Sequence, residues 1–184
     1  MAMFGLYLMA CGLLVVAGAA KVLRPRSTAR ALAPLLRVGS TIAAVRTVRS
    51  LALLEVAVGL VSIAFPYRYP AAAVAASYTA FAVFVVYVRR RGGVLATCGC
   101  FSTPDTPPTA LHVIVDVALA GAAVSTSLAG LHGALPSQLA RQPGHGVPLV
   151  AASAACGWLT FLTLVAWPRL REARRAFEDG ARVG

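Results

Sequence analysis

The segment MFGLYLMACGLLVVAGAAKVL, residues 3–23, contains no charged side chain before Lys21. A helix needs about 20 mostly apolar residues to cross the hydrocarbon core of a bilayer, and this segment has that length. Residues 16–20 resemble a signal-peptidase site and residues 8–11 a lipoprotein signal. A secretory signal, however, has a basic region before its apolar stretch. Because the first basic residue here follows the run, we expect residues 3–23 to form a retained transmembrane helix.

The same apolar pattern recurs along the rest of the chain. Further spans are predicted at roughly 48–65, 70–88, 109–132 and 148–167. Hydrophobic residues make up 59% of the chain and charged residues 12%, with a mean hydropathy of +0.77. A soluble domain carries about a quarter charged residues. The predicted fold class is therefore an all-α membrane protein, with a four-helix bundle in residues 1–132 and a fifth C-terminal transmembrane helix in the lipid bilayer.

The segments between the spans differ in character. Residues 24–47 carry Arg30 and Arg37 seven positions apart with leucines between them, which fits a basic amphipathic segment on the inner leaflet. An ordinary solvated loop fits these residues equally well. Pro66 and Pro70 bracket a very short turn, which predicts a tight antiparallel hairpin of the second and third helices. The remainder is predicted to be an extracytoplasmic loop, the fifth helix and a basic cytoplasmic tail, at residues 133–147, 148–168 and 169–184.

The distribution of basic residues indicates the orientation. The chain has 17 Lys and Arg against 6 Asp and Glu, and among the basic residues only Arg68 and Arg141 fall on the minority side of the predicted spans. Basic residues concentrate on the cytoplasmic side of membrane proteins. We therefore expect a multi-pass plasma-membrane protein with its N-terminus outside and its C-terminus in the cytoplasm. Because these arginines flank apolar runs, they fit topology determinants, and no nucleic acid is expected as a partner.

The motif Cys98-Gly99-Cys100 lies between the third and fourth spans. Glycine permits a sharp backbone bend, so the two cysteines can approach disulfide distance. A small strained ring is labile in thiol–disulfide exchange, and the upstream arginines 89–91 favour the thiolate. The alternative is that small residues simply cluster at a tight turn. Two thiolates fall short of the four ligands usual for zinc, so no metal site is predicted.

Charged groups at membrane depth form a second candidate cluster, because such groups are costly and often functional. Glu55 and Asp116 each lie about 10 Å inside the start of their predicted helices. His112 precedes Asp116 by one turn and shares its helix face. With Lys21, these residues fall in the same half of the bilayer as the dithiol, whichever way the protein faces. They predict a supporting polar pocket with a Lys21–Glu55 ion pair and a proton-handling pair, His112 and Asp116.

Each of these residues also has a purely structural interpretation. Lys21 is expected to extend its ammonium to the headgroups, and Glu55 fits a hydrogen-bonding contact between helices equally well. His112, near a helix start, is more typical of an interfacial residue. Cys11 and Cys156 are expected to be inert buried residues rather than a disulfide. Four aromatic residues of the third helix are expected to serve packing rather than a quinone site: Tyr78, Phe81, Phe84 and Tyr87.

Three motifs, in this order, resemble the MauE/DoxX family of small membrane proteins. They are Ala17-Gly18-Ala19-Ala20-Lys21, Leu53-Leu54-Glu55-Val56-Ala57-Val58-Gly59 and Cys98-Gly99-Cys100-Phe101. The resemblance covers roughly residues 3–132 and implies a four-helix DoxX-like core. The chain departs from the family at Ser102, where glycine is common, and near Asp116, where a basic residue is often found.

This resemblance implies redox chemistry. MauE members are associated with maturation of disulfide-containing partners, and DoxX relatives with thiosulfate–quinone chemistry and thiol stress. By this resemblance Cys98 and Cys100 would be the catalytic dithiol, exchanging electrons with a thioredoxin-like partner or with quinone, beside Lys21 and Glu55. Quinone is the one cofactor that it suggests. The alternative is a non-catalytic anchor or assembly subunit of a larger redox or secretion complex, docked through the fifth helix.

The expected orientation constrains the redox hypothesis. It places the dithiol toward the cytoplasm, where disulfides are normally reduced. A protein that accepts electrons there and passes them outward fits this position, whereas a purely periplasmic oxidant does not.

Overall fold

The computed structural model describes residues 2–26, 28–29, 41–90, 110–129, 146–148 and 150–163, and the single residues 166, 170 and 174. Four labelled helices lie in this part of the chain: Ala2–Leu23 (α1), Thr41–Ala64 (α3), Arg68–Arg90 (α4) and Ala110–Ala129 (α5). A fifth helical span covers Gly146–Thr163, and all five are long and apolar enough to cross a membrane. The predicted all-α membrane fold class is confirmed.

The second span differs from its predicted bounds. Helix α3 begins at Thr41 rather than at residue 48, so residues 41–47 belong to a long helix and not to a separate amphipathic segment. The reason is a tertiary contact: Ala29, just beyond α1, packs against Ala44 and Val48. This burial stabilises helical turns that hydropathy alone does not mark as part of a span. Residues 30–40, residues 133–145 of the loop expected at 133–147 and most of the expected tail lie outside the described residues. The fifth span begins at Gly146, two residues before the expected start at 148.

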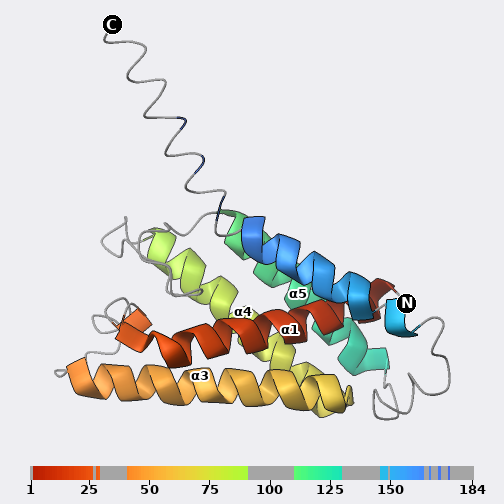
Figure 1. Ribbon diagram of the computed structural model, residues 1–184, viewed down its shortest axis with the longest axis horizontal. Helices are drawn as coiled ribbons and strands as arrows, with labels where there is room; N and C mark the ends of the chain where they lie inside the picture. The colour runs from red at the N-terminus through yellow and green to blue at the C-terminus, as the bar shows by residue number, and fades with distance from the viewer. Residues whose placement is uncertain are drawn as a thin grey trace, which may run out of the picture.

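The helices pack as two pairs joined into one bundle. α1 lies beside α3, and α4 lies beside α5, while α1 also contacts α5 and α3 contacts α4 (Figure 1). The fifth span lies beside the N-terminal half of α1, where the two helices line a common apolar groove of about 290 Å³. The structure thus places α1 in contact with α3, α5 and the fifth span, and side chains of α4 reach it as well.

The α1–α3 pair depends on two glycines that let the backbones approach closely. A Cβ atom on Gly18 would lie 2.9 Å from the carbonyl oxygen of Ala52, and one on Gly59 would lie 3.0 Å from the carbonyl oxygen of Cys11. Each glycine therefore faces the backbone of a small residue on the other helix, which fixes an antiparallel register. Small residues at helix interfaces are the usual means of close packing inside a bilayer.

The predicted tight hairpin between the second and third spans is confirmed. α3 ends at Ala64 and α4 begins at Arg68, so only residues 65–67 connect them. Pro70 falls in the first turn of α4, where a missing backbone N–H removes no helical hydrogen bond. The turn closes with the N–H of Phe65 donating to the carbonyl oxygen of Val61 at 2.8 Å.

Two tyrosine hydroxyl groups tie α1 to its neighbours. Tyr78 on α4 donates a 2.7 Å hydrogen bond to the carbonyl oxygen of Ala10, and Tyr7 on α1 donates a 3.2 Å bond to that of Ser62. Both rings are buried. A buried hydroxyl needs such a partner, and here the partner is on another helix. These bonds hold the N-terminal half of α1 against α3 and α4, while Lys21 lies near the C-terminal end of the same helix.

Candidate functional site

A buried ion pair joins α1 to α3. The ammonium of Lys21 donates to both carboxylate oxygens of Glu55, at 2.9 and 2.6 Å. The two side chains are only 7% and 14% exposed. The expectation that Lys21 extends its ammonium to the headgroups is therefore wrong. The close α1–α3 packing brings an acidic partner within reach, and a buried carboxylate left without a cation would be costly.

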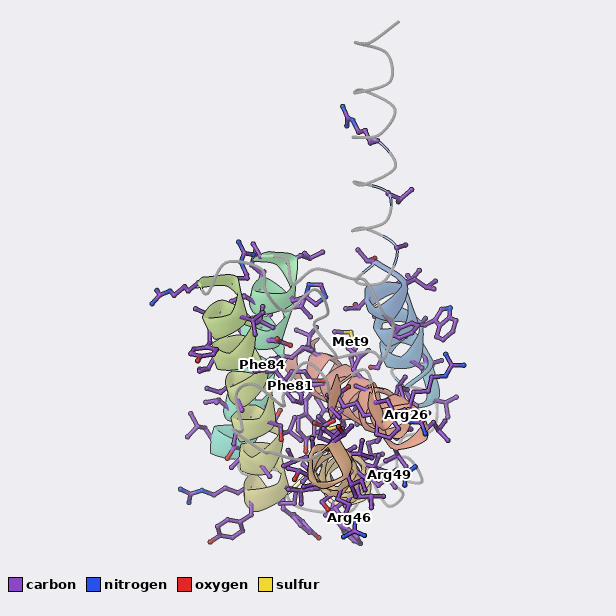
Figure 2. The ribbon with its side chains drawn as sticks, turned by 90° about the vertical axis from the view of Figure 1, so that its left-hand side faces the viewer. Met9, Arg26, Arg46, Arg49, Phe81 and Phe84 are labelled. Carbon is purple, nitrogen blue, oxygen red and sulfur yellow. The ribbon has the colours of Figure 1, made fainter. Side chains whose placement is uncertain are left out.

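An aromatic wall from α4 covers this ion pair. The Lys21 ammonium lies 4.7 Å from the centroid of the Phe81 ring, a favourable cation–π distance. The edge of that ring meets Tyr78, with centroids 5.8 Å apart and planes at 88°. Figure 2 shows Phe81 on the side of α4 that faces α1. The predicted packing role of these aromatics is confirmed for this pair, but Phe81 also contacts the charge, which helical spacing alone does not reveal.

A small cavity with mostly apolar walls and a few polar side chains adjoins the ion pair. Its volume is about 30 Å³, which is large enough to hold water. Lys21 from α1 and both His112 and Asp116 from α5 line it, within apolar walls. His112 lies in the first turn of α5, near the helix start as expected, and its side chain is buried. Three of the four predicted pocket residues thus line one cavity, and Glu55 joins them through Lys21.

Asp116 is the least satisfied of these groups. Within the described ranges its carboxyl group takes part in no hydrogen bond and no ion pair, although it lines the cavity that also contains the Lys21 ammonium. A carboxyl group at this depth is expensive to maintain without a function or a partner. Polar side chains from α1 and α5 thus face one shared cavity.

The dithiol itself lies outside the described residues. Cys98 and Cys100 belong to the segment 91–109, which joins the end of α4 to the start of α5. Between those helix ends is an open depression of about 450 Å³, lined by Arg89 and Arg90 among others. Since the buried His112 lies in the first turn of α5, both ends of the cysteine-bearing segment are attached at the end of the bundle that holds the small cavity.

The other two cysteines are free thiols and do not pair. Cys11 is buried between α1 and α3, as expected for an inert residue. Cys156 is exposed, so its expected burial is wrong. The fifth span turns Ser153 and Gly157 inward and leaves the intervening face, including Cys156, on the outside.

A model of the family described as methylamine utilisation protein MauE matches residues 1–131. The match covers α1, α3, α4 and α5, with the dithiol between the last two, and it ends before the fifth span. No curated protein and no solved structure matches the chain.

Proposed function

The chain belongs to the MauE family, and on this basis we propose that it is a membrane thiol–disulfide exchange protein acting through Cys98 and Cys100. It supports maturation of a disulfide-containing partner, in the setting of methylamine utilisation that the family description names. The observation that carries the proposal is the buried cluster of Lys21, Glu55, His112 and Asp116. Functional polar groups are retained at membrane depth against a high desolvation cost, and this cluster lies at the end of the bundle to which the dithiol segment is attached.

The exchange proceeds through a mixed disulfide. One thiolate of the reduced dithiol attacks a sulfur of the partner's disulfide, whose S–S bond breaks as the new S–S bond forms. The second cysteine then attacks the mixed disulfide and closes the Cys98–Cys100 disulfide. Two electrons and two protons pass to the partner, which leaves as a dithiol; in the reverse direction the same steps transfer the disulfide to the partner and return the Cys98–Cys100 dithiol. A thioredoxin-like dithiol restores the starting state by the same steps in reverse. A quinone in place of the partner disulfide would take up the same two electrons and two protons.

The polar cluster would support this chemistry by handling protons and charge. Each cysteine must lose its proton before it attacks, and each leaving thiolate must regain one. His112 and Asp116 line a cavity large enough to hold water, which suits a short proton path from α5. The Lys21–Glu55 pair would hold a positive charge at the edge of that cavity while holding α1 against α3.

Trapping of the mixed disulfide tests the proposal. In membranes carrying Cys100→Ser, the mixed disulfide between Cys98 and the partner cannot be resolved by the second cysteine. We therefore expect a covalent adduct with the partner that a reducing agent cleaves. The double variant Cys98→Ser/Cys100→Ser should form no adduct and should lose partner maturation. Cys156→Ser is the matched control, since it removes an exposed cysteine from another helix. A double variant that matures its partner fully would overturn the proposal.

A second function, that of an assembly subunit, is favoured by one observation. The fifth span lies beyond the family match, and large apolar side chains on it remain exposed, among them Trp158, Leu159 and Leu162. In this case the span would dock a partner subunit. Deleting the span would abolish complex formation while the double serine variant stayed active, an outcome that the redox proposal does not allow.

A further inference from the structure

We propose that α3 binds an anionic phospholipid, whose phosphate is held by Arg46 and Arg49 and whose acyl chain lies along the exposed face of the same helix. The two arginines are three residues apart in α3 and therefore share one face. This lipid site goes beyond the proposed redox function and does not depend on it.

The depth of the two arginines in the membrane is set by the length of α3. Its 24 residues span about 36 Å, against about 30 Å for the hydrocarbon core. The opposite end of α3 is marked by the hairpin turn, where Tyr67 and Tyr69 are exposed as interfacial aromatics usually are. About 20 residues counted back from Ala64 reach Val45. Arg46 and Arg49 therefore leave the backbone at or just inside the membrane boundary, within reach of the lipid phosphates.

The described part of the protein supplies no counter-charge to these arginines. Its only carboxylates are Glu55 and Asp116, and both oxygens of Glu55 are bound by Lys21. Neither Arg46 nor Arg49 forms an ion pair among the described residues. An anionic partner stabilises an arginine this close to hydrocarbon, and the planar guanidinium matches phosphate oxygens in a bidentate manner.

The face that carries the arginines continues as an apolar stripe. Leu53, Ala57 and Leu60 follow Arg49 at helical spacing, and all three are exposed. The two leucines remain 58% and 54% exposed. From Arg49 to Leu60 the helix rises about 16 Å, which is close to the thickness of one leaflet of hydrocarbon. One phospholipid can therefore place its headgroup at the arginines and its tail along the stripe.

A third arginine adds to the positive charge of the site. The packing of Ala29 on Ala44 and Val48 holds the chain after α1 against the start of α3. Figure 2 shows Arg26 at the same end of the bundle as Arg46 and Arg49, and all three side chains are exposed. This accumulation of positive charge selects an anionic lipid over a zwitterionic one, because basic groups near the surface attract anionic headgroups.

The test measures lipid binding to the purified full-length protein. Wild type, Arg46→Gln/Arg49→Gln and Arg89→Gln/Arg90→Gln are titrated with phosphatidylglycerol in detergent, and bound lipid is counted by native mass spectrometry. The second double variant is the matched control, since it removes two exposed arginines from another helix end. We expect binding to weaken about tenfold or more only when Arg46 and Arg49 are replaced. Phosphatidylcholine should bind weakly to all three proteins.

Two outcomes would overturn the lipid site. One is equal phosphatidylglycerol binding by wild type and the Arg46→Gln/Arg49→Gln variant. The other is displacement of the lipid by excess inorganic phosphate, which would show that the site binds phosphate alone and does not recognise the lipid. If the variant does not fold, the Tm of the wild-type protein is compared in phosphatidylglycerol and in phosphatidylcholine. A lipid that binds specifically should raise Tm in phosphatidylglycerol. The absence of that rise would contradict the proposal.

Discussion

In the Lys21–Glu55 pair, each charged side chain is costly to bury and depends on the other for its stabilisation. Each charge pays a large desolvation cost, which the short contacts at 2.9 and 2.6 Å and the Phe81 ring offset. The pair is mutually dependent, since either side chain alone would be an unpaired charge inside the bundle. The contribution of the pair to the free energy of unfolding is therefore best measured by removing one partner and then both.

Replacing Lys21 by methionine should destabilise the protein by about 3 kcal/mol, because Glu55 is left buried without its cation. The double variant Lys21→Met/Glu55→Met should recover most of this loss, since it replaces both charges by apolar groups. Thermal unfolding in detergent measures the three free energies, with Arg68→Gln at an exposed position as the control. A single variant as stable as wild type would mean that the ion pair does not form in the membrane protein.

Tyr78 offers a smaller effect at the same scale. Tyr78→Phe removes the hydroxyl that donates to the carbonyl oxygen of Ala10 and should cost about 1 kcal/mol of unfolding free energy. Tyr69→Phe is the matched control, because Tyr69 is 82% exposed and should tolerate the change. Equal stability of both variants would contradict a structural role for the buried hydrogen bond.

At the scale of elements, the α1–α3 interface depends on backbone proximity rather than on large side chains. Gly18 lies under Ala52 and Val56, with the carbonyl oxygen of Ala52 closest among backbone atoms. Backbone cannot move aside as a side chain can, so any added atom at this position pushes the helices apart. The Lys21–Glu55 pair, one turn further along α1, would feel the same displacement.

Gly18→Ala should therefore destabilise the protein by about 1–3 kcal/mol, although alanine is the better helix former. Gly12→Ala makes the same chemical change on the same helix, but its added Cβ meets nothing within 4 Å. That variant should be neutral or stabilised by up to about 1 kcal/mol. Unfolding of the two variants side by side gives the comparison, and equal effects would refute close packing at Gly18.

At the scale of the whole molecule, the charge asymmetry sets the expected orientation. Arg24, Arg26, Arg46 and Arg49 cluster where α1 ends and α3 begins, and Arg89 and Arg90 lie at the end of α4. With these ends on one membrane side, we expect the basic residues to face the cytoplasm. The dithiol segment would then be attached on the cytoplasmic side.

Reporter fusions measure this orientation. A fluorescent protein fused after Gly184 should fluoresce, because it folds in the cytoplasm, whereas alkaline phosphatase at that position should be inactive. Alkaline phosphatase inserted within the segment 133–147 should be active. The reverse pattern would invert the orientation and place the dithiol segment outside, where a membrane-impermeant maleimide would label Cys98 and Cys100 on intact cells.

Sequence alone determined the class of the protein and most of its elements. Hydropathy is a local property, so five apolar runs predicted five spans, and the two prolines at Pro66 and Pro70 predicted the hairpin. The approximate depth of Lys21, Glu55, His112 and Asp116 also followed, because rise per residue along a helix is constant. These inferences needed no knowledge of which helices are neighbours.

Only the tertiary structure decided what those residues contact. Whether Lys21 reaches headgroups or pairs with Glu55 depends on the distance between α1 and α3, which the two interface glycines set. The same holds for the cation–π contact of Phe81 and for the early start of α3, which Ala29 stabilises from a distant part of the chain. Contacts between helices are non-local, so a hydropathy pattern cannot encode them, and the chemistry of a buried charge is set by its neighbours.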